Sequence, residues 1–312
     1  MKRNHLLIAL TAAMLPMGFA ACSSDDDNDD TAPATYATPA HQADAASFTV
    51  SGNTTRSVVF GEGGSVVIGR VADTAAVKAT RAAGTEAIKY LVGTYTKSNA
   101  TYIIYVNSIL WGTIKVEQTA ADAYALTITT TDATGSEQVE QAEATKEDNV
   151  GSSSVLDDLC RTWQPKHTRV YLQKQPYGTM LTSPAFNGCS FEEVKQWAED
   201  ESDCRINDEF GNDYIVKDVF LTRTGTFCID FQNGKNYVGQ YTWDEVSTKE
   251  GRLTYEWADG ETMGCSYENG TASIEFKGGA YSGECWLTLE ADIKSGSDTY
   301  HVQLVIRLKE AA

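Results

Sequence analysis

Residues 226–231 have the sequence TFCIDF. Its apolar side chains Phe227, Ile229 and Phe231 alternate with Thr, Cys and Asp. Successive side chains of a β-strand point to opposite faces of a sheet. The alternation therefore predicts a strand with one apolar face and one face in water.

The same period of two recurs through the second half of the chain. Alternating segments are found at residues 162–172, 215–221, 238–246, 252–257, 272–277, 286–293 and 300–308. A flat antiparallel sheet of about eight strands would curl, and closure removes its exposed edges. We therefore predict an up-and-down β-barrel over residues 154–312.

The first half of the chain also has a β pattern. Short alternating runs occupy residues 56–60, 65–71, 87–95, 101–106, 113–118 and 124–130, with turn residues between them. This pattern is typical of consecutive antiparallel strands and predicts a small β domain over residues 47–132. The acidic, aromatic-free residues 133–153 are interpreted as a linker. The expected fold class is all-β with two domains.

The N-terminus has the layout of an export signal. Lys2 and Arg3 precede an apolar run, which closes on small residues directly before Cys22. Residues 1–21 are therefore predicted to be a signal peptide. The Ala-Ala-Cys site resembles the bacterial lipobox, which implies that Cys22 is acylated and anchors the chain to a membrane. The alternative is an ordinary secretory signal followed by a chance cysteine.

Residues 22–46 begin with an acidic run and continue without periodicity, so we expect a solvated tether. The acidic run after Cys22 also resembles the export signal of Bacteroidota-type surface lipoproteins. That resemblance implies an outer-membrane, lipid-anchored protein exposed on the cell surface. The whole chain has 25 basic and 43 acidic residues and a net charge of −18. Nucleic acid is an unsuitable partner, because its phosphates would be repelled.

Only one convincing helix is expected, over residues 191–201, because Ser190 and Glu193 form a capping box. Cys189 and Cys204 bracket this helix and are our first choice for a disulfide. Six cysteines remain after Cys22, and an exported protein meets an oxidising compartment. Buried free thiols are the alternative. The spacings lack the paired form of a zinc site.

The second half resembles a lipocalin-like (calycin-type) domain of exported Bacteroidota lipoproteins. The resemblance rests on the short helix leading into the strand at Trp163, on the β meander and on the closing strand with Arg307. It implies that Trp163 packs at the closed end of the barrel, with Arg307 lying across it as a barrel-closing pair. The glycine that lipocalins place before this tryptophan is absent, and Arg307 falls on the predicted outer face.

The resemblance further implies a cup for a small hydrophobic or glycan-like ligand. Candidate interior residues are Phe227, Phe231, Tyr241, Trp243, Tyr255, Trp257, Phe276 and Trp286. Aromatic rings of this kind could stack on sugars or cage a hydrophobe. The alternative is that they simply fill the core.

No catalytic, metal or cofactor constellation stands out. His167 and His301 lie on the first and last barrel strands and could approach each other, but both are expected to be surface residues. We therefore expect no metal and no cofactor, and a non-catalytic binding lipoprotein. The alternatives are a structural subunit that docks on an envelope protein through residues 47–132 and, less favoured, a hydrolase.

Overall fold

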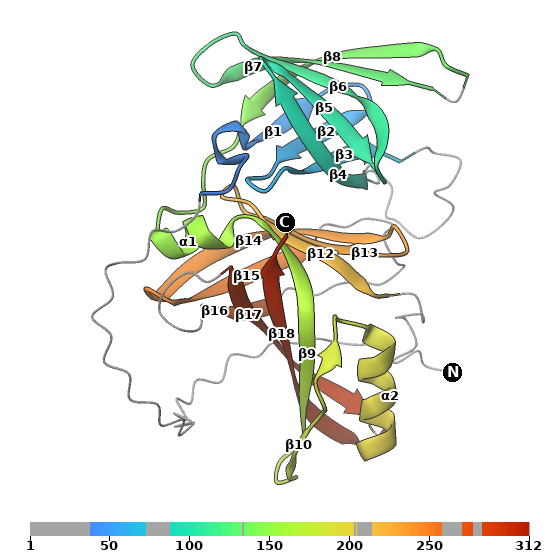
Figure 1. Ribbon diagram of the computed structural model, residues 1–312, viewed down its shortest axis with the longest axis vertical. Helices are drawn as coiled ribbons and strands as arrows, with labels where there is room; N and C mark the ends of the chain where they lie inside the picture. The colour runs from blue at the N-terminus through green and yellow to red at the C-terminus, as the bar shows by residue number, and fades with distance from the viewer. Residues whose placement is uncertain are drawn as a thin grey trace.

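A computed structural model of the chain describes residues 38–72, 88–132, 134–202, 204, 214–257, 270–276 and 283–311. Two closed, antiparallel β-barrels follow each other along the chain and stack in Figure 1, with the first barrel above the second. The predicted all-β, two-domain fold is confirmed. The predicted signal peptide, Cys22 and most of the predicted tether lie outside the described residues. No helix in the described part of the chain is long and apolar enough to cross a membrane.

The first barrel contains eight strands, preceded by the short 3-10 helix η1, Gln42–Asp44. The strands are β1 (Ala46–Ser51), β2 (Thr55–Phe60), β3 (Ser65–Val71), β4 (Ile88–Ser98), β5 (Thr101–Val106), β6 (Ile109–Gln118), β7 (Ala123–Thr131) and β8 (Glu137–Lys146). Each strand pairs with the next, and β8 closes the barrel by pairing with β1, with Val50 opposite Ala144.

The predicted linker over residues 133–153 is therefore wrong across β8. Its inward positions Glu140, Ala142 and Ala144 carry a charge and two small side chains, so no large apolar stripe marks the strand. Only the segment after Lys146 connects the two barrels.

The second barrel also contains eight strands. They are β9 (Thr162–Lys174), β12 (Val216–Leu221), β13 (Thr226–Phe231), β14 (Asn236–Ser247), β15 (Glu250–Trp257), β16 (Gly270–Glu275), β17 (Glu284–Ser295) and β18 (Asp298–Glu310). β18 closes the barrel by pairing along the whole length of β9. Helix α1 (Ser154–Leu159) precedes β9, and helix α2 (Phe191–Ser202) precedes β12.

β9 and β12 pair only where Trp163 and Thr162 meet Val219 and Phe220. Farther along β9, the short strands β10 (Met180–Thr182) and β11 (Phe186–Asn187) take the place of β12. Helix α2 lies beside them, below the barrel body in Figure 1. One end of the second barrel is therefore built from a hairpin and a helix as well as from barrel strands.

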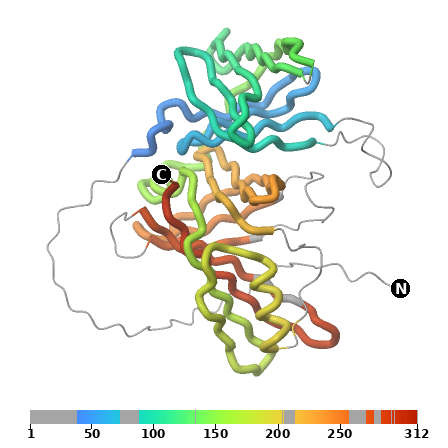
Figure 2. The backbone as a smooth tube through the Cα atoms, turned by 45° about the vertical axis from the view of Figure 1, so that its right-hand side comes forward, coloured from blue at the N-terminus to red at the C-terminus, as the bar shows by residue number. Residues whose placement is uncertain are grey.

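The junction between the barrels has its own apolar cluster. Val59 and Val67 of the first barrel pack with Phe220, Cys228 and Val238 of the second. The sequence pattern assigned Cys228 to a face in water, but the first barrel covers that face. Its burial follows from the stacking of the two domains, which a strand's own alternation does not encode. The tube in Figure 2 shows the same stacking from a second direction.

Candidate functional site

Four of the predicted interior aromatics are buried inside the second barrel, namely Phe227, Phe231, Tyr241 and Phe276. Trp243 and Tyr255 are half-buried and pack against the same core. The rings contact one another, with Phe227 and Tyr255 centroids 5.5 Å apart. The side chain of Trp257 lies outside the described residues. The structure thus gathers most of these rings into one core.

Trp286 is not an interior residue. It pairs across the strands with Arg307, whose guanidinium carbon lies 5.8 Å from the Trp286 ring centroid. Arg307 also donates to the Glu284 carboxylate. The neighbours Cys285 and Leu287 are the ones that point into the core. The prediction that Trp286 points into the barrel is therefore wrong, because the inward positions of this strand are those on either side of it.

The predicted barrel-closing pair is wrong for Arg307, which does not lie against Trp163. Trp163 is fully buried and donates from Nε1 to the Leu159 carbonyl of α1 at 2.9 Å. The cation beside it is Arg161, with its guanidinium carbon 5.8 Å from the ring centroid. Arg161 lies in the short segment between α1 and β9, so its side chain reaches the end of the barrel that α1 covers. Arg307 pairs with His167 farther along the β9–β18 ladder and faces outward, so it does not reach Trp163.

Helix α1 closes that end of the barrel. Val155, Leu156 and Leu159 are buried in the barrel core. The N-cap is Ser153, whose side chain accepts from the Leu156 amide at 3.1 Å. Tyr241 of β14 connects to the β12–β13 turn at this end, because its hydroxyl donates to the Thr222 carbonyl at 2.7 Å. A ligand would therefore meet a plugged barrel from this side.

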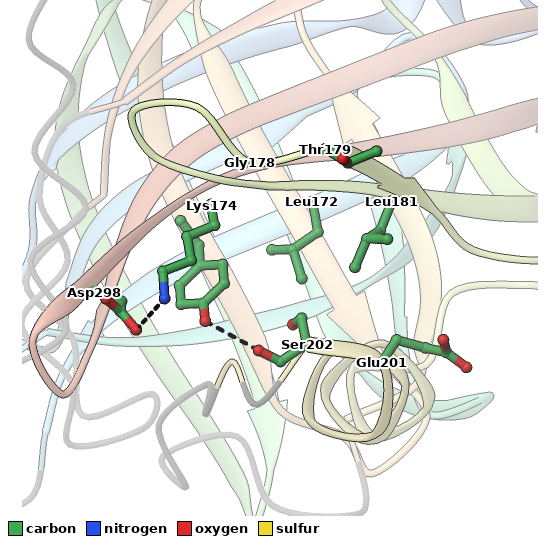
Figure 3. Close-up of a pocket in the computed structure, with 9 residues that line it drawn as sticks. Leu172, Lys174, Gly178, Thr179, Leu181, Glu201, Ser202 and Asp298 are labelled. Atoms are coloured by element: carbon green, nitrogen blue, oxygen red, sulfur yellow. Dashed lines mark hydrogen bonds and ion pairs between the residues drawn. The ribbon is translucent and has the colours of Figure 1, made fainter.

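A cavity of about 340 Å³ lies at the opposite end of β9. It is lined by Leu172, Lys174, Gly178, Thr179, Leu181, Glu201, Ser202, Asp298 and Tyr300. These residues come from β9, β10 and the turn between them, from the end of α2 and from the start of β18. Figure 3 shows the two leucines projecting into the space between the hairpin and the helix.

The polar groups of the cavity are held in place. Lys174 Nζ lies 2.6 Å from a carboxylate oxygen of Asp298. The Tyr300 hydroxyl donates to the Ser202 carbonyl at 3.0 Å, which ties α2 to β18 (Figure 3). Leu172 and Leu181 supply an apolar wall, and Glu201 supplies an exposed carboxylate. Such a surface suits a small molecule with an apolar body and polar edges.

The structure separates the two histidines that could have met. His167 pairs with Arg307 and His301 pairs with Gln173, so the two lie at different levels of the β9–β18 ladder. His301 Nδ1 lies 2.9 Å from an Asp292 carboxylate oxygen.

The predicted bridge between Cys189 and Cys204 is also not formed. The five cysteines that the described ranges contain, Cys160, Cys189, Cys204, Cys228 and Cys285, are free and buried. Cys189 and Cys204 belong to the core cluster as small apolar side chains. Burial raises the pKa of each to about 11.

The sequence pattern did not single out the cavity residues. Leu181 and Thr179 lie in a short hairpin with no alternating run, and Asp298 is the first residue of β18, directly after a tight turn. Glu62 was missed as well. It lies in the Gly61–Gly64 turn between two short strands, and it is buried at the barrel junction. The sequence feature that could have drawn attention to Glu62 is its position as a charged residue between glycines in a hairpin turn.

The fold and the cavity define an all-β protein of two consecutive closed barrels, the second of which carries a cavity at the end away from its helical plug. No protein-family profile matches the sequence, and no curated protein matches it.

Two solved structures align over most of the chain. One is a double mutant of transferrin binding protein B from Haemophilus parasuis, with 7% identity, a TM-score of 0.25 and coverage of 82% of this chain and 53% of that one. The other is a candidate outer membrane protein from Bacteroides fragilis, with 7% identity, a TM-score of 0.24 and coverage of 86% and 96%. This chain spans about half the length of the first. TM-scores this low carry no argument about fold or function.

Proposed function

We propose that this chain is a non-catalytic lipoprotein of the cell envelope, anchored through Cys22, whose second barrel binds one small ligand in the cavity between the β9–β10 hairpin and α2. The observation that carries the proposal is the cavity itself. Its volume of about 340 Å³ falls within the range of about 300–1,000 Å³ that is usual for ligand pockets. The ligand class is a small hydrophobic or glycan-like molecule.

The aromatic barrel interior supports this placement of the ligand. Phe227, Phe231 and Tyr241 are each at most 2% exposed and contact other core side chains. A ligand that entered their space would have to displace close-packed rings, which costs several kcal/mol. The cavity at the hairpin requires no such displacement, because the half-buried Leu181 already lines an open space, with the buried Leu172 behind it.

Binding can be tested by filling the cavity. Leu181→Trp places a large ring in it, whereas Met180→Trp, one position earlier on β10, changes a side chain that does not line it. The probes are the neutral fluorescent hydrophobe 1-aminoanthracene and a panel of soluble glycans. We expect at least one probe to bind the unaltered chain and Met180→Trp equally, and Leu181→Trp at least about tenfold more weakly. Equal binding by all three proteins would contradict the proposal.

A second candidate is a structural subunit that docks on an envelope protein through the first barrel. The observation that favours it is a set of exposed large apolar side chains, Ile109 at 71%, Leu110 at 60% and Val139 at 56%. Closure of the barrel removes the open sheet edge that docking by strand addition would use. If this candidate is right, the chain can be cross-linked to one envelope protein in cells. Replacing Ile109 and Leu110 by Ser should abolish that cross-link, and Val246→Ser in the second barrel should retain it.

A hydrolase is the least favoured candidate. Lys174 and Asp298 engage each other, and Glu201 stands exposed in solvent. Glycoside hydrolysis by two carboxyl groups needs one of them to act as the general acid, with its pKa raised by burial. Turnover on a glycan and ester panel that disappears in Glu201→Gln would support hydrolysis and contradict the non-catalytic proposal.

A further inference from the structure

The β2–β3 turn, Gly61–Gly64, carries a buried carboxylate into the junction of the two barrels. Glu62 is 2% exposed. Its Oε1 accepts a hydrogen bond from the backbone amide of Arg223 in the second barrel at 3.1 Å. The adjacent Gly63 lies so close to Thr162 that a Cβ there would come within 2.7 Å of the Thr162 backbone nitrogen. The turn is therefore fitted closely against the second barrel.

The second oxygen of this carboxylate is not satisfied by the protein. Glu62 Oε2 is buried and has no hydrogen-bond partner among the described residues. A cavity of about 160 Å³ lies beside it and is also lined by Thr222, Thr224, Lys146 and Asn149. A cavity of this size holds a few water molecules, and it lies below the usual range for organic ligands.

The positive charge that faces Glu62 is shared. Arg223 Nε lies 3.8 Å from Glu62 Oε1, and the same guanidinium lies 2.7 Å from Asp157 of α1. Arg223 Nε is itself buried without a hydrogen-bond partner in the part of the chain that the structure describes. The ion pair of Glu62 and Arg223 therefore lacks the side-chain hydrogen bonds that would compensate for burying an ionised carboxylate.

The other titratable or charged groups around Glu62 come from several elements. They are Lys146 at the end of β8, His41 before η1, Tyr95 of β4, Cys160 after α1 and Tyr241 of β14. Burial raises the pKa of Tyr95, Cys160 and Tyr241, so these three stay neutral near pH 7. His41, whose backbone amide donates to the Glu62 carbonyl at 3.1 Å, is the one histidine among these neighbours and therefore has a control variant of its own.

We propose that Glu62 is a pH-sensitive latch: the protonated acid holds the two barrels together, and its ionisation loosens their junction. In the neutral form Oε2 carries a proton that can be donated to water in the adjoining cavity, and no charge is buried. In the ionised form a charge is held at the junction against one shared guanidinium. This inference concerns the barrel junction and is independent of the ligand cavity at the far end of β9.

The sign of the pH dependence follows from burial. Burial raises the pKa of Glu62 from 4.5 to about 7 in the closed junction. An open junction would return the carboxyl to its ordinary pKa. The closed state therefore binds the proton more tightly, and its advantage is complete below pH 4.5 and is lost as pH rises through about 7. Opening should increase by up to about tenfold per pH unit across this window and then level off.

Hydrogen–deuterium exchange of the whole chain tests the latch. Peptides covering residues 61–65 and 222–226 are followed at about pH 5 and about pH 7.5, with rates corrected for the intrinsic pH dependence of exchange. We expect these junction peptides to exchange at least about tenfold faster at the higher pH in the unaltered chain. Peptides from the β9–β18 ladder should show no such change.

Two test variants and two control variants accompany the unaltered chain. Glu62→Gln should make junction exchange independent of pH. Asp157→Asn, at a half-buried position, should move the midpoint to lower pH because it removes a neighbouring negative charge. Glu140→Gln and His41→Gln are matched controls that should retain the dependence of the unaltered chain. A flat profile in the unaltered chain, a retained dependence in Glu62→Gln, or its loss in His41→Gln would overturn the proposal. If Glu62→Gln does not fold, an unshifted midpoint in Asp157→Asn overturns it equally.

Discussion

The guanidinium of Arg161 lies over the indole of Trp163 where helix α1 meets the first strand of the second barrel. The same guanidinium forms ion pairs with Glu310 at 2.8 Å and with Asp158 at 3.6 Å. Arg161 and Trp163 are both buried. One side chain therefore ties the helical plug to the start of β9 and the end of β18.

Replacing Arg161 with Met should destabilise the second barrel. The change leaves the buried Asp158 without its cation, and losing one member of a buried pair costs about 3–5 kcal/mol. Arg307→Met is the matched control, because Arg307 and Glu284 pair on the outer face, where a loss of at most about 1 kcal/mol is expected. Urea unfolding followed by tryptophan fluorescence measures both. Equal losses would show that Arg161 does not have this role.

Glu140 should stabilise the first barrel in a pH-dependent way. Partial burial alone would raise its pKa, but hydrogen bonds from the amides and hydroxyls of Thr54 and Thr55 outweigh burial and lower the pKa to about 2. A lowered pKa stabilises the fold above pH 4.5, and this contribution is lost as pH falls toward 2. Glu140→Gln should cost about 1–2 kcal/mol at neutral pH.

Thermal unfolding at several pH values checks this. The difference between the unaltered chain and Glu140→Gln should shrink as the pH is lowered from about 6 to about 3. A difference that stays constant over that range would show that the carboxylate charge is not what Thr54 and Thr55 recognise.

The buried cysteines should be unreactive in the folded protein. Burial raises the pKa of Cys189 and Cys204 to about 11, so little thiolate is present near neutral pH. Iodoacetamide should leave both unmodified in the native chain and modify both in urea without added reductant. A non-reduced peptide in which the two are joined would contradict the free thiols of the structure.

Cys22 should carry the lipid. Cys22→Ser is expected to abolish incorporation of labelled palmitate and to move the protein from the membrane fraction to the soluble fraction. Cys285→Ala, in the second barrel, should leave both properties unchanged. Labelling that persists in Cys22→Ser would contradict the lipobox interpretation.

The second barrel could be predicted because its strands alternate strongly. Val302, Leu304, Ile306 and Leu308 all point into the core, as the period of two requires. β8 of the first barrel could not be predicted in the same way, since Ala142 and Ala144 fill its inward positions and Val139 points outward, exposed. Small side chains suffice there because larger ones on other strands, such as Ile114 and Leu126, fill the barrel.

Contacts between distant segments were the other limit. Cys228 and Glu62 are buried by the opposing barrel, and Leu181 lines a cavity only because β10 replaces β12 along β9. Alternation within a segment reports the face of a strand, whereas these positions depend on what the fold places against that face. Arg161 belongs to the same class, because its partners come from α1 and from the last strand.

Methyl NMR can locate a ligand in the cavity at the end of β9. Leucine and isoleucine methyl signals are recorded while the probe that binds most tightly is added. We expect shifts to concentrate at Leu172 and Leu181, with Leu253 and Leu287 of the barrel core unmoved. Shifts confined to the core leucines, or to Ile109 and Leu110 of the first barrel, would contradict it.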